Sequence, residues 1–181
     1  MFSTRATAVK RFFGIALSLF VLVGVQVSAA NKRKASNHTV IAKTAGAVTI
    51  KSDGVRVSLE PVRKNQSLAT RIARVPAGKN IYLVLKNIQT NKQPGELYHV
   101  YLNLEEGKKA TPEAAVGTLN FFNFERKPSP DSFFSFNVTE ALKKLAADRQ
   151  LSERLTITII PDGTPEEGAI PTIGQIELVE Q

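Results

Sequence analysis

The chain of 181 residues has no cysteine, no tryptophan, one methionine and only two histidines. Without cysteine it has no disulfide, no thiolate metal ligand and no cysteine nucleophile. His38 and His99 are too few for a coupled dicopper centre, which needs roughly six imidazole ligands. The H-E-x-x-H, P-loop and G-x-S-x-G motifs are also missing. We therefore expect no enzymatic activity, no catalytic residues, no cofactor and no bound metal.

The longest apolar run lies at the N-terminus. Residues 12–25 carry no charge, follow Arg5, Lys10 and Arg11, and lead to small residues that end at Ala29 and Ala30. This order is typical of a signal peptide over residues 1–30, cleaved at one of these alanines. The alternative is an uncleaved membrane anchor, but the run is slightly shorter than the ~20 residues that span a bilayer core. We expect export to the periplasm or the medium, with no stable membrane span after cleavage.

Basic residues are concentrated in two places. Loss of the leader would lower the net charge from +8 to +5, and the remaining excess lies at residues 32–34 and 63–74. Residues 31–38 form a polar segment without periodicity, which predicts a flexible basic tail. Nucleic-acid surfaces interleave basic and stacking aromatic residues, but here the aromatics cluster at 121–136. We therefore expect no nucleic-acid partner, and at most a weak attraction to anionic membrane or polysaccharide surfaces.

Residues 39–181 are long enough for one domain with its own core. Short runs of β-branched residues are separated by glycine, proline and aspartate turns, which predicts roughly eight to ten strands. The predicted fold class is all-β: an antiparallel β-sandwich or compressed, jelly-roll-like barrel with one short helix. The predicted strands cover residues 40–43, 47–51, 55–59, 68–75, 81–88, 97–104, 116–124, 133–138, 155–160 and 173–179.

Four local features are predicted in more detail. Asp53-Gly54 is typical of a tight hairpin. Residues 68–75 lack a clean amphipathic side and are predicted to form an edge strand. The strands at 81–88 and 97–104 are expected to be antiparallel neighbours. Thr139 is expected to cap a helix over residues 140–147, whose leucines at i and i+3 give one apolar stripe.

Several segments resemble a known domain. Residues 97–103 (LYHVYLN), 116–121 (VGTLNF), 157–161 (ITIIP) and 172–176 (TIGQI) follow one another in this order. In order and spacing they resemble the C-terminal domain of polyphenol oxidases and tyrosinases, which is built around a K-F-D-V signature. The resemblance is strongest over residues 76–181. The signature falls on residues 97–100, where Val100 is identical and Leu97 and His99 replace the lysine and the acid.

This resemblance implies a function in protein contact. In the family, the domain folds over a dicopper site, inserts a side chain at its mouth and keeps the enzyme latent until cleavage. We expect the present chain to be a non-enzymatic exported module whose partner is a tyrosinase-like oxidase or another envelope protein, which it shields or helps to fold. The alternatives are a structural or adhesive envelope module unrelated to copper and, less favoured, a copper-delivery protein. His99 is expected to be a hydrogen-bonded structural residue, since it has no second soft ligand nearby.

The candidate partner-contact residues are phenylalanines. Phe121, Phe122, Phe133 and Phe134 fall in predicted strands, where consecutive side chains point to opposite faces. One ring of each pair is therefore expected to be exposed unless the helix or a partner covers it.

Overall fold

The fold is an antiparallel sheet that curves back on itself. The computed structural model describes residues 38–105, 107, 109–122, 124, 132–151 and 154–181, and Ser36–Gln181 forms one compact unit. The elements are β1 (Thr39–Lys43), β2 (Val48–Thr49), β3 (Val55–Pro61), α1 (Leu68–Ala73), β4 (Ile81–Gln89), β5 (Tyr98–Leu102), the short 3₁₀-helix η1 (Pro112–Ala114), β6 (Gly117–Leu119), β7 (Phe133–Asn137), α2 (Thr139–Ala147), β8 (Leu155–Pro161) and β9 (Thr172–Glu180).

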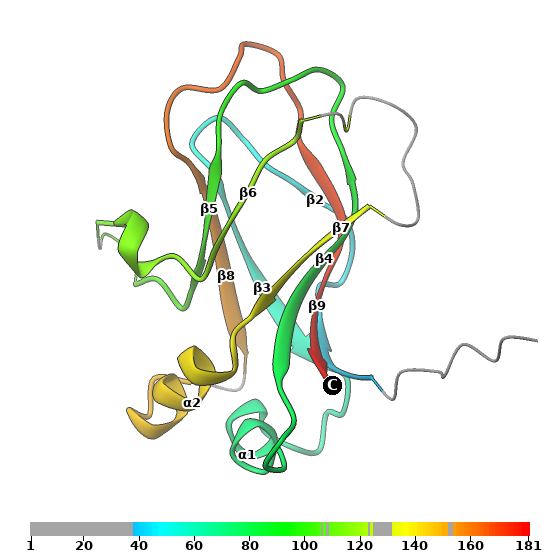
Figure 1. The fold of residues 1–181 in the computed structure, drawn as a ribbon, viewed down its shortest axis with the longest axis vertical. Coiled ribbons are helices and arrows are strands. Elements are labelled where there is room, and N and C mark those ends of the chain that lie inside the picture. Colours follow the sequence, from blue (N-terminus) through cyan, green and yellow to red (C-terminus); the bar gives the residue numbers. More distant parts are fainter. Residues whose placement is uncertain (1–37, 106, 108, 123, 125–131, 152–153) are drawn as a thin grey trace, which may run out of the picture. The chain divides into compact units, whose positions relative to one another are not determined.

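The nine strands form one sheet with the order β6-β5-β8-β3-β1-β9-β4-β7, and β2 pairs with β9. All pairings given for these strands are antiparallel. The two halves of the sheet meet at β1, which pairs with β3 only through Ala42 and Lys43. Figure 1 shows the two halves facing each other, with α1 and α2 at the same end. The predicted fold class, an antiparallel β-sandwich or compressed barrel, is confirmed.

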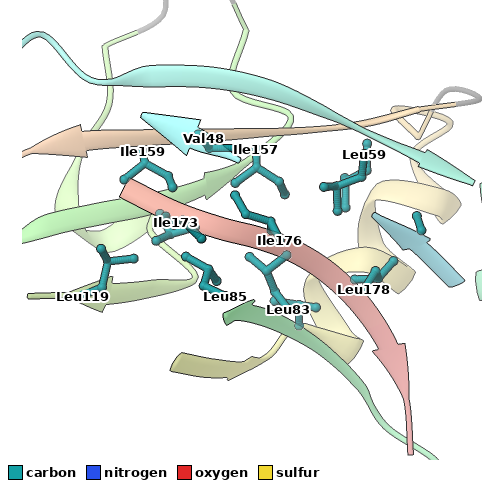
Figure 2. Packing of buried hydrophobic residues seen from close by; sticks show 14 of the residues in the cluster. Val48, Leu59, Leu83, Leu85, Leu119, Ile157, Ile159, Ile173, Ile176 and Leu178 are labelled. Atoms are coloured by element: carbon teal, nitrogen blue, oxygen red, sulfur yellow. The ribbon is translucent and has the colours of Figure 1, made fainter. Parts of the chain in front are cut away.

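The core fills the space between the two halves. Leu83 and Leu85 of β4 and Ile176 of β9 point toward Leu59 and Ile157 of the facing strands (Figure 2), and all five side chains are buried. Every residue of this buried cluster lies between positions 41 and 178. The core of the described residues thus lies within the unit Ser36–Gln181, and we expect this unit to fold without residues 1–35.

A left-handed residue, Asn87, changes the inward-facing side of the central strands, while the register of β4 on β9 stays the same. Asn87 adopts a left-handed φ of 55°, and a side chain on the facing Gly174 would place its Cβ 2.7 Å from the Asn87 Cβ. The buried positions therefore change from odd to even residue numbers on β4, from Leu83 and Leu85 to Ile88. On β9 they change from even to odd, from Ile176 to Ile173. Glycine at position 174 therefore leaves room for the Asn87 side chain.

The two ends of the sheet meet through side chains. β6 and β7 are the terminal strands of the pairing order, yet the Phe136 ring lies over Gly117, where an added Cβ would be 2.3 Å from the ring. Glycine thus leaves room for the phenylalanine that covers the seam between β6 and β7.

The predicted helix is α2, but its capping differs from the prediction. The Thr139 side chain does not cap the helix, which begins at Thr139 itself. Its Oγ1 donates to Asn137 Oδ1 at 2.7 Å and accepts from the Ile81 amide at 2.8 Å. Asn137 Oδ1 also accepts the Thr139 amide at 3.1 Å. The threonine thereby ties the start of α2 to β4.

The predicted edge strand at residues 68–75 is wrong, because this segment contains helix α1. Ser67 Oγ accepts the Thr70 amide at 3.2 Å, which is the usual N-cap interaction. Leu68 and Ile72 lie one turn apart and are both buried.

Two predicted strand relationships are also wrong. β4 and β5 are not neighbours, since β4 pairs with β7 and β9 whereas β5 pairs with β6 and β8. The tight turn lies one residue earlier than predicted: Lys51 and Gly54 exchange backbone hydrogen bonds across Ser52-Asp53. The strands on either side then separate, because β2 pairs with β9 and β3 pairs with β1 and β8.

Candidate functional site

The predicted strand over 116–124 ends at Leu119, and Phe121 and Phe122 follow it in a turn. The Phe121 side chain is only 1% exposed and contacts the Tyr98 ring edge-to-face, with ring centroids 5.2 Å apart. The Phe122 side chain is 69% exposed, and its amide donates to Asn120 Oδ1 at 3.1 Å. The turn therefore separates the pair into a core ring and a surface ring.

β7 separates the second pair by strand alternation. Phe134 and Phe136 are half-buried and stack with their centroids 6.3 Å apart. Phe133 points the other way and is 58% exposed. In register it lies beside Lys86 of β4.

Phe122 and Phe133 each lie close in sequence to a contact between the turn after β6 and the start of β7. The Phe124 and Phe134 rings lie 6.0 Å apart, so the turn after β6 packs against the start of β7. Phe122 is two residues from the first of these rings and Phe133 is next to the second. We call the two exposed rings the Phe122–Phe133 surface. Of the four candidate contact residues, the structure thus exposes two, half-buries Phe134 and places Phe121 in the core.

His99 lies on the outer face of β5. Its Nδ1 is 3.1 Å from Thr118 Oγ1 on β6, and its ring is 6.5 Å from that of Tyr101. Nε2 lies 3.4 Å from Asp162 Oδ1, within ion-pair distance for a protonated ring, but without hydrogen-bond geometry. The contact with Thr118 joins β5 to β6. Among the described residues, no group of three potential metal ligands is present.

Two tyrosines on the same strand have perturbed phenols. Burial raises the pKa of Tyr98 above its ordinary value, and the Glu96 carboxylate adds to the effect. Burial likewise raises the pKa of Tyr101, with contributions from Asp162 and Glu113. Tyr98 Oη is buried and has no hydrogen-bond partner in the part of the chain that the structure describes.

These phenols predict a loss of stability in alkali. A pKa that is higher in the folded state means that folding favours the neutral phenol, so the stabilisation is complete below the unfolded pKa of about 10 and is lost as the pH rises through the folded value. We expect the free energy of unfolding, measured by urea titration, to fall from about pH 9 upward. Tyr98→Phe should flatten this fall and, by removing an unsatisfied hydroxyl, change the neutral-pH stability by less than ~1 kcal/mol. Identical pH profiles for the parent, Tyr98→Phe and Tyr101→Phe would contradict this.

Sequence reasoning missed other exposed apolar side chains. Val62, Leu97 and Ile170 are also exposed, and each lies in a connection or at a strand end, where periodicity gives no orientation. Across the described ranges, no helix is long and apolar enough to span a membrane.

Comparisons with known proteins give one family model and several solved structures. The model of the DUF7868 family, a domain of unknown function, matches residues 37–181. Curated protein sequences give no match. The matching solved structures include latent apple tyrosinase (12% identity, TM-score 0.49, 74% of this chain and 27% of that chain). They also include recombinant latent aurone synthase, a polyphenol oxidase (20% identity, TM-score 0.47, 73% of this chain and 24% of that chain).

The chain therefore spans about a quarter of the length of these structures. The predicted resemblance to the polyphenol oxidase and tyrosinase family is confirmed.

Proposed function

The chain belongs to the DUF7868 family, and we propose that it is a non-enzymatic exported module that acts by protein–protein contact, with a tyrosinase-like oxidase as its partner. The observation that carries this proposal is the exposure of the Phe122 and Phe133 rings. The partner is proposed from the sequence resemblance.

Two exposed phenylalanine rings are unusual for a surface without a partner. Burying a large apolar side chain is favourable, and this free energy is not gained while the ring stays in water. Buried aromatic side chains contribute strongly to binding at interfaces. The backbone below the rings is held in place: Asn120 fixes the turn at Phe122, and β7 pairs with β4 over five positions. A partner would therefore meet preorganised rings, which reduces the entropic cost of binding.

The proposal is tested by capture from the native envelope fraction. The predicted mature chain, residues 31–181, serves as bait, and bound proteins are identified by mass spectrometry. We expect a tyrosinase-like dicopper oxidase to be recovered. The double variant Phe122→Ser and Phe133→Ser should capture about tenfold less oxidase than the parent, because two interface aromatics are removed.

Val62→Ser is the matched control, because it also removes an exposed apolar side chain but lies in the connection after β3. It should capture as much oxidase as the parent, and all variants should melt alike. If the double variant recovers as much oxidase as the parent, Phe122 and Phe133 do not form the contact with the oxidase. Recovery of envelope proteins without an oxidase would favour a structural module instead.

A further inference from the structure

Two polar hollows flank the connection between β3 and α1. One, of about 730 Å³, is lined by Arg63, Asn65, Gln66, Ser67, Thr70 and Arg74. The other, of about 590 Å³, lies across residues 65–67 and includes Lys64 and Arg154. The first hollow contains only cationic or neutral polar side chains, and guanidinium, hydroxyl and amide groups are hydrogen-bond donors that suit phosphate oxygens.

The cations here differ from their neighbours in lacking acidic partners. Arg71 forms an ion pair with the buried Glu180, which also lies 3.3 Å from Lys79 Nζ. Arg154 lies 3.7 Å from Glu60. In contrast, no ion pair is found for Arg63, Lys64 or Arg74 within the described ranges, and all three side chains are exposed. Their positive charge is therefore uncompensated.

An apolar side chain stands beside these cations. Val62 immediately precedes Arg63 and Lys64 and is 51% exposed. A soluble polyanion gains little from an exposed valine, whereas membrane interfaces bind apolar and basic side chains together. The combination favours a lipid surface over a free anionic polymer.

Strand β1 lies beside the same connection. Thr39 and Ile41 line a third hollow with Arg63 and Arg71.

We infer that the face formed by Val62, Arg63, Lys64 and Arg74 binds the phosphate groups of an anionic phospholipid surface. Basic residues near such a surface gain affinity from its negative potential, and the gain is lost at high salt. This inference is independent of the oxidase contact, because the two surfaces share no residue.

The test is co-sedimentation of residues 31–181 with phosphatidylcholine vesicles, with and without phosphatidylglycerol. This fragment lacks the apolar run but contains the compact unit. We expect binding only to the phosphatidylglycerol vesicles, with release by salt. The triple variant Arg63→Gln, Lys64→Gln and Arg74→Gln should bind roughly a hundredfold more weakly, at about fivefold per charge. Val62→Ser should weaken binding a fewfold.

The matched control is Lys51→Gln, Lys92→Gln and Lys109→Gln, which removes the same charge from other parts of the molecule. It should bind within about threefold of the parent, because its charges lie away from the lipid contact. Equal weakening of both triple variants would show an effect of net charge alone and overturn the site. Absence of vesicle binding, or stronger binding to heparin or inorganic polyphosphate than to vesicles, would also overturn it.

Discussion

Gly54→Val is expected to lower the free energy of unfolding by about 3 kcal/mol or more. Gly54 has a φ of 101°, which valine rarely adopts, and an added Cβ would lie 2.4 Å from the Ile159 carbonyl oxygen on β8. The obstacle is backbone, so no side-chain rotation relieves it. β3 pairs with β8 from Val55 onward, and the variant therefore disturbs the beginning of this ladder. Urea-induced unfolding gives the measurement.

Gly46→Val is the control, since an added Cβ there meets no atom within 4 Å. It should cost less than ~1 kcal/mol, because only the flexibility of glycine is lost. If Gly54→Val unfolds at the same urea concentration as the parent, the positive φ and the close approach to β8 are both wrong.

The same residue shows what the local sequence could predict. Asp-Gly correctly indicated a tight turn with glycine at positive φ, because these preferences arise within a few residues. The position of the turn and the partners of its strands depended on distant segments. β2 pairs with β9 and β3 pairs with β8, and both partners come roughly a hundred residues or more later in the chain.

The helix α1 was missed for a related reason. Its sequence LATRIA contains β-branched residues and only two buried positions, so the apolar periodicity of a single short helix is weak. The decisive features were the Ser67 cap and the packing of α1 beside α2, and only the first of these is local. Tertiary packing decides the state of such short segments.

The sequence could predict which residue types form the candidate site, but not which of their side chains are exposed. The alternation rule applied at Phe133 and Phe134 because they do lie in a strand, whereas the exposure of Phe122 arises from the turn after Leu119. The cationic face was visible as a basic stretch at 63–74. Which of its charges are uncompensated depended on Glu180 and Glu60, which reach Arg71 and Arg154 only in the folded chain.

Phe121→Ala is expected to destabilise the fold by about 3–5 kcal/mol, whereas Phe122→Ala should change the free energy of unfolding by less than ~0.5 kcal/mol. The first substitution opens a cavity beside Tyr98 and removes an edge-to-face contact at 5.2 Å. The second truncates a ring that is 69% exposed. Thermal and urea unfolding of the two single variants, measured side by side, separate core from surface at adjacent positions.

The pair also decides whether the Phe122–Phe133 surface is available for contact. Phe133→Ala should behave like Phe122→Ala, since both rings face solvent, and Phe134→Ala should fall between the two classes because its half-buried ring packs on Phe124 and Phe136. A binding defect in Phe122→Ala or Phe133→Ala with unchanged melting would then arise from the interface. If either variant instead unfolds as readily as Phe121→Ala, its ring stabilises the fold and the proposed contact surface loses that residue.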